Sequence, residues 1–260
     1  MSSYPYIVFP ERYIKINQQL PPLPEEPTKP ELKLVKKNLF EKLILWCDDY
    51  DDECINERRR IKYEEQLNNY RIELKRYQDN VKQILSDTNI SIFREAERKK
   101  SLESTRMGSP RCHEVLKGRF DDIFLYHLHN AFGNNITDSI EFMLPNQRAF
   151  VPDAAYVNRS TGLCIDIEID EPYSLPDKKP IHYIGSDEYR NSFFSENGWF
   201  VIRFAEEQVA KYPEDCVKYV NDFISGIAVG KMPIFTNCVE RWSFSDAYGM
   251  SETNYRESYQ

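Results

Sequence analysis

Glycine and cysteine are scarce in this sequence, and it has no long apolar run. Nine of the 260 residues are glycine and six are cysteine, and no two cysteines form a C-x-x-C pair. This spacing matches no zinc site and favours the reduced thiols of a cytoplasmic protein. No apolar run approaches the roughly 20 residues of a membrane helix. The start, MSSYPYIVFPERYIK, lacks the pattern of a secretory leader, so we expect neither a membrane segment nor a signal peptide.

Positive charge is in deficit overall but unevenly distributed. The formal net charge is −8 with an isoelectric point near 5.2, which argues against a generic basic nucleic-acid binder. Residues 55–119 nevertheless carry 16 basic and 10 acidic side chains, net +6, between segments of net −3 and −11. Two basic clusters lie in this segment and are either solvated helix faces or phosphate contacts. They are Arg58, Arg59 and Arg60, and Arg98, Lys99 and Lys100.

Proline dominates the first 33 residues. Prolines at 5, 10, 21, 22, 24, 27 and 30 exclude a long helix and predict an extended connector over 1–33. The apolar patches Tyr6–Phe9 and Tyr13–Ile14 are candidate anchors on another surface. The alternative is a proline-rich docking ligand.

Residues 34–106 contain neither proline nor glycine and predict a helical or coiled-coil arm. A seven-residue seam runs through Tyr63, Leu67, Tyr70, Leu74, Tyr77, Val81 and Ile84. A helical face continues upstream through Leu43, Trp46, Tyr50 and Cys54. We expect a long helix or a helical hairpin, and the tyrosines on the seam favour packing against the chain's own helices. A homo-oligomer or a protein partner bound through the arm is the alternative.

Residues 109–230 alternate between helical and strand patterns and predict an α/β (α+β) domain, followed by a tail over 231–260. Ser109 and Pro110 suit the cap and first position of a helix, and Gly133 suits its end. The turn NRSTG at 158–162 predicts a hairpin. The expected elements are a helix over 109–132, strands over 139–144, 149–158 and 163–170, a helix over 187–197, a strand over 199–204, and a helix over 205–227 broken at Pro213.

Carboxylates alternate along the expected strand 163–170. Asp166, Glu168 and Asp170 share one face, and isoleucines occupy the other. Asp153, on the neighbouring hairpin strand, can lie beside them. Four carboxylates on one patch repel each other, and a divalent cation removes that repulsion. Hard oxygen ligands favour Mg²⁺ or Mn²⁺ over zinc. The alternative is an edge strand with a solvated acidic face.

A longer pattern surrounds these residues. Pro152-Asp153 precedes the hairpin, the run IEIDEPY follows it, and His182, the Asp187–Arg190 D-x-x-R run and the strand GWFVIRF come next. Over residues 109–227 the pattern resembles the PD-(D/E)XK nuclease superfamily, in particular its very-short-patch-repair-like branch. The resemblance implies a restriction-endonuclease-like core: a helix, a three-stranded antiparallel hairpin sheet, a helix, a strand and a helix.

The resemblance also assigns metal ligands. Asp153 matches the metal ligand of the Pro-Asp motif, Glu168 matches the second acidic ligand, and the carbonyl of Ile169 is a further ligand. Glu114, on the expected helix before the sheet, matches the acidic residue that many members place beside the metal; an ordinary surface glutamate is the alternative.

The main departure from the family is Asp170, which stands where most members have a lysine. Lys178 or Lys179 in the following loop, or His182, are candidates for the missing positive charge. Alternatively, Asp166 pairs with Glu168 in an arrangement without lysine. His182 also has a plain interpretation, as a residue that caps its loop.

The function implied by the resemblance is metal-dependent endonuclease cleavage of DNA, in bacterial defence, repair or mobile-element biology. The alternatives are an RNase of the same fold and a catalytically lapsed fold that binds nucleic acid or assembles with a partner. We expect nucleic acid to contact the basic clusters, Lys178, Lys179 and Arg190; the alternative for Arg190 is that it holds the carboxylate cluster. For Arg203, inside the buried strand, we expect a structural salt bridge, and we treat Asn191 as scaffold.

Overall fold

The computed structural model describes residues 3–31, 49–114 and 117–259, with the side chains of 49–55 left out. The chain divides into two compact units. The larger unit comprises residues 1–19 and 94–260, and the arm unit comprises residues 20–93. In the described ranges, no helix combines the length and the apolar character needed to cross a membrane. The predictions for Leu43, Trp46 and the side chains of Tyr50 and Cys54 lie outside the described residues.

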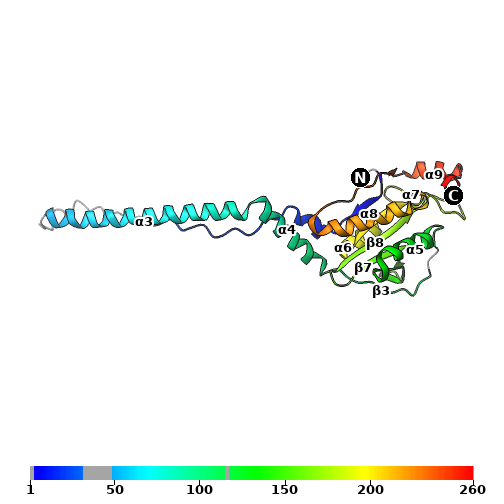
Figure 1. The fold of residues 1–260 in the computed structure, drawn as a ribbon, viewed down its shortest axis with the longest axis horizontal. Coiled ribbons are helices and arrows are strands. Elements are labelled where there is room, and N and C mark those ends of the chain that lie inside the picture. Colours follow the sequence, from blue (N-terminus) through cyan, green and yellow to red (C-terminus); the bar gives the residue numbers. More distant parts are fainter. Residues whose placement is uncertain (1–2, 32–48, 115–116, 260) are drawn as a thin grey trace. The chain divides into compact units, whose positions relative to one another are not determined.

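A mixed five-stranded sheet forms the centre of the larger unit (Figure 1). Its strands lie in the order β2 (Tyr6–Val8), β9 (Phe200–Ala205), β8 (Leu163–Asp170), β7 (Ala154–Asn158) and β4 (Ile136–Thr137). Strand β8 pairs in parallel with β9, and the other pairs are antiparallel. Because β8 is central, all eight of its residues are buried. The larger unit is therefore a mixed α/β domain.

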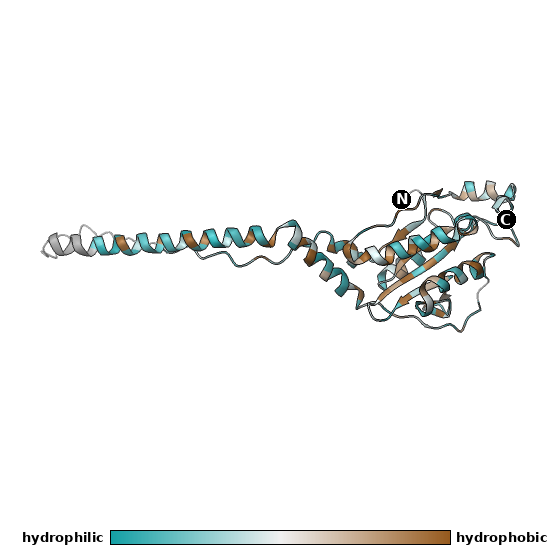
Figure 2. Cartoon of the chain, viewed as in Figure 1, coloured by the Kyte–Doolittle hydropathy of each residue, from teal (hydrophilic) through white to brown (hydrophobic). Residues whose placement is uncertain are grey.

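The predicted alternation along β8 is confirmed. Ile165, Ile167 and Ile169 pack into the main core with helices α5 (Asp121–Phe132) and α8 (Pro213–Gly226). The opposite face carries Cys164, which packs with Phe194 of α6 (Glu188–Glu196). By alternation, the three carboxylates of β8 continue on this second face. Figure 2 shows the apolar colouring of the central strands against the polar outer helices.

The other elements of the larger unit surround this sheet. They are β1 (Ser3–Tyr4) paired with β10 (Val239–Glu240), α1 (Glu11–Ile16), a second sheet of β3 (Ser109–Pro110), β5 (Ile140–Met143) and β6 (Ala149–Phe150), η1 (Gly133–Asn135), α7 (Glu206–Lys211), η2 (Ile227–Val229), α9 (Phe244–Glu252) and η3 (Tyr255–Tyr259).

Several predicted boundaries are confirmed. Strand β8 begins and ends at the predicted residues, and the NRSTG turn closes at Gly162 with φ +75°. Helix α6 lies inside 187–197, and the helix after β9 breaks before Pro213, which opens α8. The C-terminal tail packs back, because Arg256 is buried and binds Glu206.

The predicted helix start at Ser109 is wrong. Ser109 and Pro110 form β3, which pairs with Glu141 and Ile140 of β5, and the helix begins only at Asp121. An edge strand tolerates proline because the missing N–H is not needed by the ladder. Glu114 therefore lies in an exposed loop, not on a helix.

The predicted three-stranded hairpin sheet also differs from the observed sheet. The strand expected over 139–144 is β5, which pairs with β3 and β6 outside the five-stranded sheet. Its expected place is taken by the shorter β4. The run 149–158 is split into β6 and β7 around Pro152, whose ring cannot donate a ladder hydrogen bond.

The extended connector predicted over 1–33 is wrong for its first part. Residues 3–16 form β1, β2 and α1, and β2 supplies an edge strand next to β9, with Tyr6 opposite Arg203. The two apolar patches do anchor this segment, because Tyr6 and Tyr13 are buried. The prolines that excluded a long helix are compatible with these short elements.

The arm unit is built on α3 (Asp49–Ile84), a single 36-residue helix, followed by the start of α4 (Asp87–Leu102). All seven predicted seam residues are half-buried. The extended residues 20–31 belong to the same unit and run beside α3 (Figure 1). Pro21, Pro24, Pro27 and Pro30 are half-buried and the residues between them are exposed.

This burial pattern repeats every three residues, which is the period of a polyproline II helix. We infer that the four prolines face the seam of α3. The part of the predicted hairpin that would precede α3 falls on residues 34–48, which lie outside the described residues. Within the described part, the arm unit holds α3, the start of α4 and the proline-rich strap of residues 20–31.

Candidate active site

A cleft of about 700 Å³ lies at the C-terminal end of β8. Its walls come from the loop before α5, from the start of β7, from the 171–187 loop, from α6 and from η3. Of the predicted site residues, Asp153, Glu168, Ile169, His182 and Arg190 line it.

Asp153 and Glu168 meet at the base of the cleft. The Asp153 backbone N–H donates to Glu168 Oε1 at 3.3 Å, and the Ile169 N–H donates to Asp153 Oδ2 at 2.8 Å. These bonds arise because Asp153 directly precedes β7, whose first residue pairs with Ile167. Burial, followed by the charges of Glu168 and Asp121, raises the pKa of Asp153 well above its usual value.

Asp121 is a site residue that the sequence analysis missed. It is the first residue of α5, it is buried, and its Oδ2 accepts a hydrogen bond from the Gly118 N–H at 2.7 Å. Burial raises its pKa, and the charge of Glu168 adds to this rise. The helix carboxylate beside Asp153 and Glu168 is therefore Asp121, whereas Glu114 does not line the cleft. The run Gly118–Asp122, with a glycine before two aspartates, was the available signal for a helix start.

Arg190 lines the cleft and joins Glu168 of β8 to the segment before β7. Its Nη2 donates to Glu168 Oε1 at 2.5 Å and to the Val151 carbonyl at 2.8 Å. Burial alone would raise the pKa of Glu168, but Arg190 and Arg203 hold it below its usual value. Glu168 is thus kept ionised by two guanidinium groups.

Asp170 is held by Arg203 and does not line the cleft. Arg203 Nη2 lies 2.6 Å from Asp170 Oδ1, and Arg203 Nε lies 3.0 Å from both carboxylate oxygens. Arg203 Nη1 also donates to Asn191 Oδ1 at 3.1 Å. The predicted structural salt bridge of Arg203 is confirmed, and Asn191 contacts this arginine.

His182 joins this ion-pair network to the cleft. Its Nδ1 lies 3.1 Å from Asp187 Oδ2 and 3.7 Å from Asp170 Oδ1, and its Nε2 lies 3.7 Å from Glu171 Oε2. Burial disfavours its charged form, but Asp170 and Asp187 raise the pKa of His182 to about 9. His182 is therefore a cation near neutral pH.

Asp166 lies on β8 two residues before Glu168, further from the end of the strand at which the cleft lies. It is fully buried, it does not line the cleft, and neither carboxylate oxygen has a hydrogen-bond partner among the described residues. Arg190 Nη2 lies 3.7 Å from its Oδ1. Burial, with the charge of Glu168, raises the pKa of Asp166 well above its usual value. Asp166 therefore favours the neutral acid.

Glu171, directly after β8, is a further titratable group in the cleft that the sequence analysis did not select. Burial raises its pKa to about 7, although the charge of His182 opposes the shift. It lies two residues beyond Ile169, directly after the end of β8, where the sequence pattern indicates only that the strand ends.

The tightest group of metal-ligating atoms in the described part of the chain lies beside this cleft. Atoms of Asp170, His182 and Asp187 lie within 4.8 Å of one another. Two of these residues already carry Arg203 contacts, because Arg203 lies 2.6 Å from Asp170 and 3.4 Å from Asp187. A cation there would have to displace a buried guanidinium, so the group is better described as an ion-pair network.

The cleft carboxylates have the chemistry that a hard divalent cation requires. Asp121, Asp153 and Glu168 offer only oxygen ligands, and the charge of Glu168 adds to the raised pKa values of both Asp121 and Asp153. Bound Mg²⁺ or Mn²⁺ would offset this repulsion. The donor chemistry therefore fits such an ion, although these three residues do not bring one ligand atom each within 4.8 Å of one another.

Most of the other basic residues predicted to bind nucleic acid lie away from the cleft lining. Arg98 is buried and donates to Asn17 Oδ1 at 2.8 Å, so its predicted availability to phosphate is wrong. Lys178 Nζ binds Asn254 Oδ1 at 2.5 Å, and Lys179 pairs with Asp177 at 2.7 Å. The remaining cations are exposed on α3 and α4: Arg58, Arg59, Arg60, Lys99 and Lys100.

Comparisons of the chain with protein-family models, with curated proteins and with solved structures found no match. What the site does chemically is therefore inferred from its own residues.

Proposed function

We propose that this protein is a metal-dependent nuclease that hydrolyses DNA phosphodiester bonds. The observation that carries the proposal is the meeting of Asp153 and Glu168 at the base of a cleft, with Asp121 electrostatically coupled to both. Apart from η1, β5, β6 and α7, the elements follow the order α5, β4, β7, β8, α6, β9 and α8, which supports a restriction-endonuclease-like core.

Asp153, Glu168, the carbonyl of Ile169 and Asp121 would hold the ion, with Asp121 in the role first expected of Glu114. Mg²⁺ or Mn²⁺ at this place supplies a Lewis acid that polarises a phosphodiester and lowers the pKa of an attacking water.

The protein's own residues prepare the site for this chemistry. Arg190 and Arg203 keep Glu168 ionised, so that it is available as an anionic ligand. The Ile169 N–H fixes one oxygen of Asp153 and thereby orients its carboxylate. Glu171, with a pKa of about 7, is suited to hold or release a proton at its carboxyl near neutral pH.

Part of the positive charge that a polyanionic substrate needs at the cleft comes from residues that were not predicted. Lys117, Arg119, Arg190 and protonated His182 line the cleft, whereas Lys178 and Lys179 do not. Arg119 is exposed and has no ion-pair partner among the described residues. We assign phosphate contact to Arg119, because Lys117 already pairs with Asp122 at 2.5 Å and with Asp138 at 3.3 Å. The exposed basic residues of α3 and α4 remain predicted contacts.

The test is cleavage of labelled DNA and RNA, single- and double-stranded, by wild type and Asp153→Asn with Mg²⁺ or Mn²⁺. We expect wild type to cut DNA and the variant to lose at least about a hundredfold in rate, because the ligand charge is gone. Asp177→Asn, an exposed acid outside the cleft, is the matched control and should retain full activity. Equal cleavage by wild type and Asp153→Asn would overturn the assignment.

A catalytically lapsed fold is the second candidate, favoured by the 2.5 Å contact of Arg190 with Glu168. A guanidinium at this place can neutralise Glu168 without any metal. On this alternative, wild type binds nucleic acid and cleaves none under any metal condition. Cleavage of RNA alone would instead identify an RNase.

A further inference from the structure

A second pocket of about 420 Å³ lies at the opposite end of the hairpin from the cleft. It is bordered by the end of β7, by the turn after it, by η1 and by the residues before β3. None of its lining residues lines the cleft. Five residues separate Asp153 from Asn158, which at the strand rise is about 17 Å.

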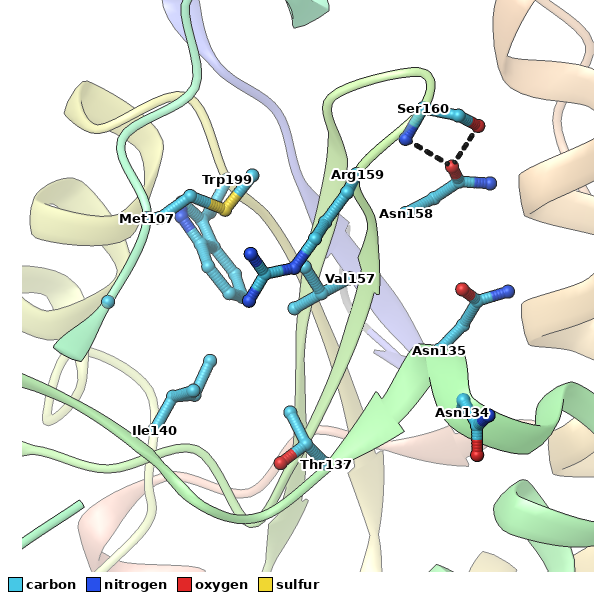
Figure 3. Close-up of a pocket in the computed structure, with 11 residues that line it drawn as sticks. Met107, Asn134, Asn135, Thr137, Ile140, Val157, Asn158, Arg159, Ser160 and Trp199 are labelled. Atoms are coloured by element: carbon cyan, nitrogen blue, oxygen red, sulfur yellow. Dashed lines mark hydrogen bonds between the residues drawn. The ribbon is translucent and has the colours of Figure 1, made fainter. Parts of the chain in front are cut away.

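One wall of the pocket is apolar. Met107, Ile140, Val157 and the indole of Trp199 form it (Figure 3). Trp199 is held rigidly, because it is fully buried and its Nε1 donates to the Arg106 carbonyl at 2.7 Å. The ring therefore supports the wall from within, and Met107, Ile140 and Val157 provide the accessible apolar surface.

The remaining wall is polar and carries a single charge. Arg159 extends from the β7–β8 turn across the pocket toward Trp199, while Asn134 and Asn135 stand on the other side (Figure 3). In the described part of the chain, these three side chains have no hydrogen-bond or ion-pair partner. No carboxylate lines the pocket, so it favours an anion and offers nothing to a metal cation.

We propose that this pocket binds a nucleotide, with its phosphate on Arg159, its base against the Met107–Val157 wall and its polar base edge facing Asn134 and Asn135. Each part of the ligand matches one observed feature: an unpaired guanidinium for the phosphate, an apolar wall for the ring, and amide groups that both donate and accept for the base edge. The volume lies within the usual range of small-ligand pockets. The proposal is independent of whether the cleft is a nuclease site.

Such a nucleotide has two possible sources: a free mononucleotide, or one residue of a strand that also reaches the cleft. The distance of about 17 Å between the two sites corresponds to about five stacked nucleotides at 3.4 Å each. A strand shorter than this would reach only one of the two sites.

The test is calorimetric binding in the presence of a chelator, so that no divalent ion contributes. The probes are 5′-dTMP, 5′-AMP, thymidine, inorganic phosphate and a thymidine hexanucleotide. Arg159→Gln should weaken the two mononucleotides by about tenfold or more, the loss of one charge-assisted contact, without changing the affinity for thymidine. Asn135→Leu should weaken thymidine as well as the mononucleotides.

Arg148→Gln is the matched control, because Arg148 is an exposed arginine of the β5–β6 turn that lines neither site. Tighter binding of the hexanucleotide than of dTMP, lost in Arg159→Gln, identifies a strand as the source; equal binding identifies a free mononucleotide. The proposal is overturned if no probe binds, if phosphate alone binds as tightly as dTMP, or if Arg148→Gln weakens binding as much as Arg159→Gln.

Discussion

Arg190 donates a 2.5 Å hydrogen bond to Glu168, and this contact sets the protonation of the carboxylates beneath the cleft. The same guanidinium lies 3.7 Å from Asp166, and its Nη2 also binds the Val151 carbonyl. One arginine on α6 therefore ties the carboxylate face of β8 to the segment that leads into β7. Glu168 stays ionised beside it, while Asp166, which has no hydrogen bond among the described residues, favours its neutral form.

Removing this arginine should destabilise the larger unit. Arg190→Gln leaves the buried Glu168 charge with fewer partners, and we expect a loss of about 3 kcal/mol in the free energy of unfolding. Chemical unfolding followed by circular dichroism measures it. The control Arg148→Gln, on the exposed turn, should change stability by less than about 0.5 kcal/mol. Equal stability of the two variants would contradict this interpretation of Arg190.

The Asp170–Arg203 pair should behave as one buried unit. Asp170→Asn leaves the fully buried Arg203 without its main counter-charge and should cost about 3–5 kcal/mol. The double variant Asp170→Leu with Arg203→Met should cost less than the sum of the single changes, since no charge is then left unpaired. Denaturant unfolding of wild type, Asp170→Leu, Arg203→Met and the double variant measures the coupling. If Asp170→Asn keeps full stability yet loses cleavage, Asp170 acts in catalysis and not in the ion pair.

His182 predicts a specific pH dependence of stability. Asp170 and Asp187 overcome the effect of burial and raise its pKa to about 9, above the unfolded value of about 6.5. A raised pKa stabilises the fold fully below the unfolded value and loses this contribution as pH rises through the folded value. The difference between the unfolding free energies of wild type and His182→Gln should therefore fall by up to about 3 kcal/mol between about pH 6 and pH 10. A difference that grows with pH would show the opposite sign and contradict the account.

The half-buried seam of α3 and the exposed residues of the same helix form two different faces. Tyr70→Ala removes a half-buried aromatic side chain from the seam and should destabilise the arm by about 1–2 kcal/mol. Ile72→Ala, which is 44% exposed on the same helix, is the matched control and should have a smaller effect. Rates of limited proteolysis within residues 56–84 measure both. Greater sensitivity of the Ile72 variant would mean that the prolines do not cover the seam.

Local patterns accounted for much of the larger unit. The bounds of β8, the turn before it and the break at Pro213 all follow from alternation, turn chemistry and the missing proline N–H. The burial of the isoleucine face of β8 was predicted correctly for the same reason. In each case the deciding physics lies within a few residues along the chain.

The errors arose where distant segments decide the structure. Strand β2 pairs with β9 almost 200 residues away, and no local pattern in Tyr6–Val8 announces that partner. Ser109 and Pro110 suit a helix start, but pairing with β5 outweighs that local preference. Asp121 looked like one acid among many, because its closeness to Asp153 depends on how α5 packs on the sheet.

The most direct test of the central claim is Mn²⁺ binding, measured by electron paramagnetic resonance on wild type, Asp153→Asn and His182→Gln. We predict that wild type binds one saturable ion and that Asp153→Asn loses it. His182→Gln should retain the ion, because His182 belongs to the Arg203 ion-pair network. Binding that survives Asp153→Asn but disappears in His182→Gln would place the metal at Asp170, His182 and Asp187 and contradict the assignment to the cleft carboxylates.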